Sequence, residues 1–211
     1  IDTNKFSVHQ VILKIINSLQ YLSKQNQNKI QFTLEENFPK YIYGDKTKFV
    51  QIIMNLVMNA LKFTSKGLIE IDIKVLNKTD DDIDIQINIK DNGIGINNSE
   101  QNLIFNTFIQ LNRKQADYQG TGLGLSIVKK LVELFGSTIE LESQEKIGTK
   151  FSFTIGFETD EFTRNEIINN IVMISILLSG AALVREREHG TIEHLMVMPL
   201  RAFEIMLSKI L

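Results

Sequence analysis

Asn55, Asn59 and Lys62 lie within an otherwise apolar segment, KFVQIIMNLVMNALKF (48–63). Their spacing of four and three residues would place the three side chains on one face of a helix. Because the helix is apolar almost all round, we expect it to be buried, and a buried amide without a partner costs about 1–3 kcal/mol. The amides could bond to neighbouring backbone groups. Alternatively, an Asn oxygen could bind Mg²⁺ beside phosphates, with Lys62 giving those phosphates a positive charge.

A second polar stretch, DNGIGI (91–96), directly follows an alternating apolar strand. An Asn-Gly hairpin turn is one interpretation, but no second alternating strand begins after Ile96. The other is that Asp91 presents a carboxylate at the strand end, while Gly93 and Gly95 let the backbone approach a flat ligand. A carboxylate there can accept a hydrogen bond from an amine such as the exocyclic amine of adenine.

Three glycines at alternate positions, Gly120, Gly122 and Gly124, open the segment GTGLGLSIVKKLVELFG (120–136). Glycine destabilises a helix, and exposed N–H groups at a helix start can bind an anion such as phosphate. A flexible loop that leads into a packed helix is the alternative. The spacing matches neither the dinucleotide fingerprint nor the P-loop.

Between the two glycine stretches lie Phe105 and Phe108, which could belong to the core or anchor a lid at 109–119. Arg113 and Lys114 in that lid could reach phosphate or remain solvated.

The elements that must position these residues follow from apolar periodicity. Three helices are predicted, over about 7–24, from an Asp45 cap to Phe63, and over about 122–135. Alternation predicts strands at 29–35, 68–76, 83–91, 137–143 and 149–157, with a turn at 79–82. A sheet on one side and helices on the other make a two-layer α+β sandwich.

Composition narrows the function classes. The net charge of −2 gives no electrostatic argument for nucleic acid, and the absence of Cys excludes disulfides, thiol catalysis and zinc–thiolate sites. The chain begins at Ile1 without a charged-then-apolar leader, and we interpret it as an excerpt of a longer polypeptide.

Together, these segments resemble the catalytic ATP-binding domain of sensor histidine kinases, in the GHKL superfamily. NLVMNALKFT resembles the N box, DNGIGI the first glycine box, IFNTFIQ the F box and GTGLGLSIVKKLVELFG the second glycine box. GTKFSFTI (148–155) resembles the closing strand motif, and YGDKTKFVQII the approach to the N box. The resemblance covers about residues 2–157 and implies the Bergerat ATP-binding fold, a mixed, mostly antiparallel sheet with helices on one face.

The resemblance implies that residues 1–158 bind Mg-ATP. Asn59 would be the magnesium ligand, Asp91 would contact the adenine amine, and Thr149 would lie near the base. Gly120, Gly122 and Gly124 would surround the phosphates. The candidate catalytic residues are Asn55, Asn59 and Lys62. The candidate nucleotide-binding residues are Asn55, Asn59, Lys62, Asp91, Gly93, Ile94, Gly95, Ile96, Phe105, Phe108, Arg113, Lys114, Gly120, Thr121, Gly122, Leu123, Gly124, Leu125 and Thr149.

Asn55 favours a kinase within this superfamily. The ATP-hydrolysing branches have Glu at this position as a base for water, and Asn cannot take a proton at neutral pH. A kinase would hold ATP for a protein nucleophile, so its catalysis is mostly positioning and charge neutralisation.

The phosphoacceptor of such a kinase is a His on a dimerising helical hairpin. His9, His189 and His194 do not match that pattern. We therefore expect the chain to bind ATP, not to phosphorylate itself alone, and to need a separate acceptor domain and, through it, a response-regulator receiver domain. A nucleotide-binding module without transfer activity and a chimeric membrane transport component are the alternatives.

The C-terminal segment differs in composition, because seventeen of the eighteen Lys precede residue 171 and no Asn follows it. Its uninterrupted apolar run, 171–184, is short for a membrane span of about 20 residues. Residues 170–211 resemble a fragment of a bacterial ABC exporter permease, joined to the ATP-binding domain by a junction at 159–169. We expect a cytoplasmic ATP-binding domain, a candidate membrane contact at 167–211, and no metal site at Glu188-His189 or Glu193-His194.

Overall fold

The computed structural model describes residues 3–107, 122–159, 168 and 171–179. The chain divides into two compact units, residues 1–160 and 161–211.

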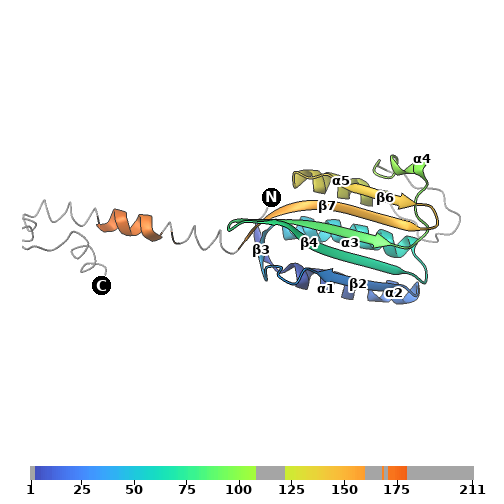
Figure 1. The fold of residues 1–211 in the computed structure, drawn as a ribbon, viewed down its shortest axis with the longest axis horizontal. Helices are drawn as coiled ribbons and strands as arrows, with labels where there is room; N and C mark the ends of the chain where they lie inside the picture. The colour runs from blue at the N-terminus through green and yellow to red at the C-terminus, as the bar shows by residue number, and fades with distance from the viewer. Residues whose placement is uncertain (1–2, 108–121, 160–167, 169–170, 180–211) are drawn as a thin grey trace, which may run out of the picture. The chain divides into compact units, whose positions relative to one another are not determined.

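Seven strands form one sheet in the first unit (Figure 1). They are β1 (Asn4–Phe6), β2 (Lys29–Leu34), β3 (Ile42–Gly44), β4 (Leu68–Lys78), β5 (Asp82–Asp91), β6 (Glu140–Gln144) and β7 (Gly148–Thr159). The order is β1-β3-β7-β5-β4-β2, and β6 pairs with β7. The β2–β4 pair is parallel and the other pairs are antiparallel, so the sheet is mixed and mostly antiparallel as expected.

Helices cover one face of this sheet, and in Figure 1 α1, α3 and α5 lie behind the strands. The helices are α1 (Val8–Ser18), α2 (Gln20–Gln25), α3 (Lys46–Phe63), α4 (Asn98–Gln101) and α5 (Gly124–Leu134). The alternating apolar residues of β4, β5 and β7 are buried toward them, whereas their polar neighbours face the other side of the sheet. This confirms the two-layer mixed sandwich, because period-2 alternation makes a strand apolar on one face only.

Helix α3 begins at the predicted cap. The Asp45 carboxylate accepts the Lys48 N–H at 3.0 Å, which satisfies one of the free donors of the first turn. The expectation that this helix is buried all round is wrong, because Met58 is 46% exposed. A helix in the outer layer of a two-layer sandwich has one face toward the sheet and the other toward solvent.

Three other differences concern the ends of elements. The single helix expected over 7–24 is two helices, because at Leu19 the backbone leaves helical geometry with φ −96° and ψ 2°. Helix α5 begins at Gly124 rather than near Gly122, whose φ is +69°, and β6 begins three residues later than predicted. The short strands β1 and β3 were not predicted, since three residues show no periodicity.

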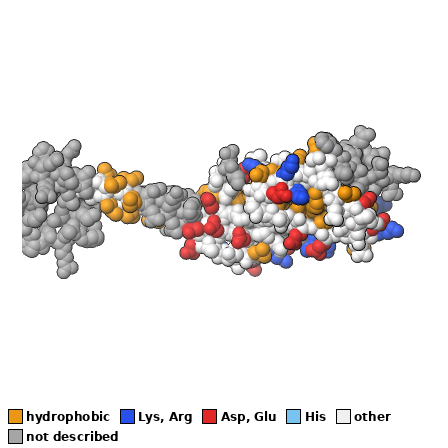
Figure 2. All heavy atoms as spheres, turned by 90° about the horizontal axis from the view of Figure 1, so that it is seen from above, with side chains coloured by type: hydrophobic (Ala, Val, Ile, Leu, Met, Phe, Trp, Pro, Cys, Tyr) orange, Lys and Arg blue, Asp and Glu red, His pale blue; other side chains and the backbone are white. Residues whose placement is uncertain are grey.

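In the second unit, residues 171–179 are helical. Seven large apolar side chains on this helix are exposed, and they form the orange cluster of the helix in Figure 2. They are Ile171, Val172, Met173, Ile174, Ile176, Leu177 and Leu178. Within residues 3–107, 122–159 and 171–179, no helix has the length and apolarity that crossing a bilayer requires. The predicted tail beyond residue 179, with His189 and His194, lies outside the described residues.

Candidate functional site

Helices α3 and α5 meet at Asn55, Asn59 and Gly124. A Cβ atom built on Gly124 would lie 3.6 Å from Asn55 Oδ1 and 3.9 Å from Asn59 Nδ2. Both amides are half-buried, and among the described residues neither side chain has a hydrogen-bond partner. The alternative that they bond to neighbouring backbone groups is therefore not observed in the part of the chain that the structure describes.

Lys62 lies one turn further along α3 and is also half-buried. Its ammonium lies 5.1 Å from the centre of the Phe63 ring, within cation–π range. The i, i+4, i+7 spacing predicted from the sequence is thus realised in α3. The start of α5 has no side-chain cap on its first-turn N–H groups.

Asp91 ends strand β5, and its side chain is buried, with 7% of its surface exposed. Oδ1 accepts the Gly93 N–H at 2.9 Å, and Thr149 is the cross-strand neighbour on β7. Burial raises the pKa of Asp91, although the backbone N–H groups of Gly93 and Thr149 and the hydroxyl of Thr64 act to lower it. Desolvation dominates, because a carboxylate in a low-dielectric site has lost its water.

The Thr64 hydroxyl lies beside this carboxylate. The Cβ position of Gly93 is 2.7 Å from Thr64 Oγ1 and 2.9 Å from Asp91 Oδ1. Thr64 Oγ1 is buried and makes no complete hydrogen bond within the described residues, although it is close enough to affect the pKa of Asp91. A buried polar atom of this kind calls for a ligand or water partner.

The glycines of DNGIGI are required by close backbone approach, and the stretch is not a hairpin. A Cβ on Gly93 would collide with the Phe63 carbonyl oxygen, and a Cβ on Gly95 would collide with the Gln144 carbonyl oxygen. Gly95 also has φ +65°, which favours glycine. Ile94 lies between them, donates its N–H to Phe63 O at 3.1 Å and is 38% exposed.

The β6–β7 hairpin holds the same stretch from the other side. Ile96 is half-buried, and its N–H donates to Ser143 Oγ at 2.8 Å, while the Lys146 N–H donates to Ile94 O at 2.7 Å. Ser143 Oγ also donates to Gly148 O at 3.0 Å and lies 3.0 Å from Thr149 Oγ1. Thr149 is buried and pairs with Asp91 across the strands. Through the hydrogen bonds of Ser143, the hairpin therefore links the glycine stretch to Thr149 and Asp91.

Other predicted site residues have plainer surroundings. Phe105 packs edge-on against Phe151 with ring centres 6.2 Å apart, which favours the core interpretation. Leu123 is the N-cap position of α5, and Leu125 is half-buried in its first turn. Phe108, Arg113, Lys114, Gly120 and Thr121 lie outside the described residues.

Sequence reasoning missed Thr64, Ser143 and Gly148. Thr64 directly follows α3, so its position as helix C-cap was the available signal. Gly148 has φ +139°, and a Cβ there would collide with Asp91 O. Ser143 gave no signal, because a lone Ser in a half-exposed strand is common.

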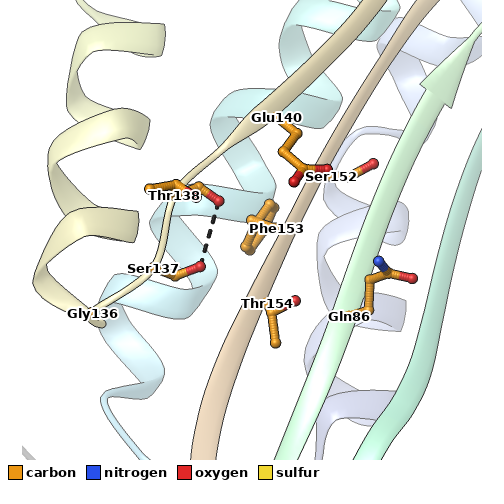
Figure 3. A pocket seen from close by; sticks show the side chains of 8 residues that line it. All are labelled: Gln86, Gly136, Ser137, Thr138, Glu140, Ser152, Phe153 and Thr154. Atoms are coloured by element: carbon orange, nitrogen blue, oxygen red, sulfur yellow. Dashed lines mark hydrogen bonds between the residues drawn. The ribbon is translucent and has the colours of Figure 1, made fainter.

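A separate polar depression lies on the other face of the sheet (Figure 3). It has a volume of about 320 Å³ and is lined by Gln86, Gly136, Ser137, Thr138, Glu140, Ser152, Phe153 and Thr154. None of the predicted site residues lines it. We therefore place the candidate site at the Asn55 and Asp91 groups, on the helix side of the sheet, rather than in this depression. Among the described residues there is no cluster of three acidic or His side chains able to hold a metal ion.

The comparisons with known proteins concern the family and the fold. Residues 44–159 match the family described as histidine kinase-, DNA gyrase B- and HSP90-like ATPase. Histidine protein kinase 1 of Candida albicans is 41% identical over 139 residues, which are 64% of this chain and 6% of that protein. Signal transduction histidine-protein kinase BarA of Escherichia coli is 31% identical over 159 residues, 75% of this chain and 17% of the relative. The chain thus spans a small part of the length of these relatives.

Solved structures share the fold. The catalytic domain of histidine kinase ThkA superposes with a TM-score of 0.60 at 25% identity, covering 74% of this chain and 95% of that domain. Full-length ShkA, solved in complex with AMPPNP, superposes with a TM-score of 0.64 at 21% identity, covering 75% of this chain and 32% of ShkA. The family match ends at residue 159, and none of these comparisons supports the permease resemblance of residues 170–211. The match over more than half of its length shows that the chain belongs to the histidine kinase-, DNA gyrase B- and HSP90-like ATPase family.

Proposed function

We propose that residues 1–158 are the Mg-ATP-binding catalytic domain of a histidine kinase, and that they donate the γ-phosphoryl group of ATP to a His on a separate dimerisation domain. The observation that carries the proposal is the meeting of Asn55 and Asn59 with the glycine that starts α5, in a chain that buries Asp91 beside an unpartnered hydroxyl. Family membership supplies the ATP-binding fold, and the residue roles are our inference.

Asp91 receives the adenine amine in this proposal. The carboxylate is buried, and desolvation raises its pKa. An exocyclic amine would add a donor where water has been lost. Thr64 Oγ1 lies in the same place as a second polar atom for the base, and Gly93 lets the backbone pass close to Phe63 O and so holds Thr64 and Asp91 together. The residues present therefore fit a planar base with polar edges. Ile94 and Ile96, on either side of Gly95, supply apolar surface to it.

Asn55, Asn59 and Lys62 hold the phosphate end. Asn59 is the proposed magnesium ligand: its amide has no protein partner among the described residues, and an amide oxygen is a hard, neutral ligand that can bind Mg²⁺ beside phosphates. The ion would neutralise phosphate charge during transfer. Lys62 supplies a further positive charge. The start of α5, where Leu123 makes no side-chain cap, offers backbone N–H groups to phosphate near Gly122, Leu123 and Gly124. Gly120, Thr121, Arg113 and Lys114 complete the proposed phosphate surroundings from outside the described residues.

Asn55 favours transfer to protein over hydrolysis, because an amide cannot act as a general base for water and hydrolysis of the bound ATP is therefore slow. An amide in this position holds water without accepting its proton, so bound ATP persists until an acceptor side chain arrives. The acceptor His belongs to a dimerisation domain, and a response-regulator receiver domain receives the phosphoryl group from it. Relatives named hybrid signal transduction histidine kinases and a solved complex of ThkA with the response regulator TrrA support a response regulator as partner.

The remaining segments have no part in this chemistry. We propose that residues 159–169 are a junction and that residues 170–211 form an apolar, helical tail. His9 lies on α1, with its ring 5.9 Å from the Phe32 ring, and its side chain is a surface histidine rather than an acceptor.

The binding test is Mg-dependent affinity for a non-hydrolysable ATP analogue, measured by calorimetry on the 211-residue chain. We expect Asn59→Ala to weaken binding at least about tenfold in Mg²⁺, since hydrogen bonds and ligation at charged groups are worth about 1.5–3 kcal/mol. Asp91→Ala should weaken binding with and without Mg²⁺. Met58→Ala, an exposed neighbour on α3, is the matched control and should bind like wild type. Wild-type affinity in both site variants would refute the assignment.

The transfer test uses labelled ATP, with and without a separately produced acceptor hairpin. We expect acid-labile label on the hairpin and none on the chain alone. Label on the isolated chain would contradict the proposal. ATP binding without label on any acceptor hairpin would favour a nucleotide-binding module without transfer activity.

A further inference from the structure

The Ser143 hydroxyl has three partners and one proton. Its Oγ lies 2.8 Å from the Ile96 nitrogen, 3.0 Å from the Gly148 carbonyl oxygen and 3.0 Å from Thr149 Oγ1. All three distances lie within hydrogen-bond range. The direction of each bond follows from counting donors and acceptors.

The Ile96 N–H can only donate, and the Gly148 carbonyl can only accept. The Ser143 hydroxyl therefore accepts a hydrogen bond from the Ile96 N–H and donates its single proton to the Gly148 carbonyl oxygen. The third bond can then exist only if the Thr149 hydroxyl donates its proton to Ser143, which has one lone pair left. The direction between Ser143 and Thr149, which distance alone leaves open, is settled by this count.

Once its proton is committed to Ser143, the Thr149 hydroxyl can only accept hydrogen bonds from a ligand. Thr149 pairs with Asp91 across β5 and β7, and both side chains are buried. Asp91 is two residues from buried Ile89, and Thr149 is two residues from buried Phe151. Residues two apart in a strand share a face, so both side chains lie on the helix face of the sheet. An ionised Asp91 is likewise an acceptor only. This corner of the site therefore demands N–H donors.

We propose that Ser143 is a specificity-determining positioning residue, which fixes the Thr149 hydroxyl as an acceptor and so makes the site select a purine that carries an exocyclic amine. This inference rests on the proposed function and deepens it. Ser143 acts through Thr149 and need not touch the nucleotide.

The test compares ATP with purine riboside triphosphate, which lacks only the exocyclic amine. The measured quantity is the ratio of the two dissociation constants for the full chain. We expect wild type to prefer ATP, and Ser143→Ala to lower that preference roughly tenfold, because a freed Thr149 hydroxyl can rotate and donate. Ser143→Thr keeps a hydroxyl and should keep the preference.

A double-mutant cycle separates this role from a merely structural one. Thr149→Val removes the hydroxyl that Ser143 orients, so adding Ser143→Ala to Thr149→Val should leave the ratio unchanged. An unchanged ratio in Ser143→Ala alone, or an equal drop in both backgrounds, would overturn the inference.

Three further outcomes are also decided by the test. If Ser143→Ala fails to fold, Thr149→Val and Thr149→Ser carry the decision, and a wild-type ratio in Thr149→Val overturns the inference. If wild type binds ATP but shows no preference for it, the inference fails together with the amine contact of Asp91, while the proposed ATP binding stands. If wild type does not bind ATP, the proposed function fails with it.

Discussion

Gly124 lies against Asn55: a Cβ atom on the glycine would be 3.6 Å from the amide oxygen. That distance is ordinary van der Waals contact, so the fold tolerates a methyl group there. It also places the first residue of α5 beside the polar face of α3. The absence of a side chain at 124 leaves open the space next to both unpartnered amides.

Gly124→Ala should therefore separate folding from binding. The glycine does not have a positive φ, and Gly→Ala in a helix is favourable by roughly 0.5–1 kcal/mol. We expect an unchanged or slightly higher melting temperature and at least about tenfold weaker binding of the ATP analogue. Calorimetry and thermal unfolding measure the two quantities. A variant that binds like wild type would show that phosphate does not approach this glycine.

Asp91→Asn should stabilise the protein at neutral pH while weakening nucleotide binding. Burial raises the pKa of Asp91, so the folded state holds this proton more tightly than the unfolded state does. Such a group favours folding below its unfolded pKa, and this contribution is lost as the pH rises through the folded pKa. At pH 7 the ionised carboxylate is thus a cost, which the neutral amide removes.

The same argument gives the pH dependence of this variant. Its advantage in melting temperature over wild type should shrink as the pH falls through the raised folded pKa, and it should be lost below about 4, where the carboxyl becomes protonated in the unfolded state as well. Asp82→Asn, an exposed position at the other end of β5, is the control. An advantage that is constant with pH would contradict burial as its origin.

Gly95→Ala should be more destabilising than Gly136→Ala. The two glycines have similar positive φ values, +65° and +74°. Backbone strain in alanine should therefore lower the free energy of unfolding by a similar amount, about 1–2 kcal/mol, at each position. Only Gly95 has an obstacle, the Gln144 carbonyl oxygen, whereas nothing lies within 4 Å of a Cβ on Gly136. The collision should add about 1–3 kcal/mol in urea unfolding. Equal losses would mean that the β6–β7 hairpin moves away freely.

Asn55→Glu should increase the slow hydrolysis of ATP by water. A carboxylate can accept the proton that an amide cannot, and a positioned general base contributes about 10²–10⁴-fold in favourable cases. We expect at least about a tenfold rise in phosphate release. Asn55→Gln, which is similar in size but cannot act as a base, should show none. A rise in both variants would point to loss of water exclusion instead.

Removal of residues 161–211 should leave nucleotide affinity within about twofold of the full chain, since the proposed ATP-site residues all belong to the unit 1–160. The exposed apolar helix at 171–179 should promote self-association, so the shorter chain should be more monomeric in sedimentation measurements. A large loss of affinity would show that the second unit contributes to the site.

Period and spacing in the sequence determined the layers of the fold. Alternation in 68–76, 83–91 and 149–157 predicted the central strands, because a strand with one covered face repeats every two residues. The i, i+4 spacing of Asn55 and Asn59 predicted their common face on α3, because residues four apart lie one turn apart on a helix. The helix break at Leu19 and the three-residue strands β1 and β3 were not predicted. Features this short show no periodicity, and their conformation depends on the segments against which they pack.

Only the tertiary structure decided which distant residues share the site. Gly95 and Gln144 are 49 positions apart, and no local pattern says that one backbone must pass so close to the other. Ser143 has an ordinary sequence context, and its proposed role follows from three partners that come from the glycine stretch and from the start of β7. Sequence fixes the local periodicity and the chemical groups, whereas hydrogen-bond direction and steric exclusion arise only when separate segments are brought into contact.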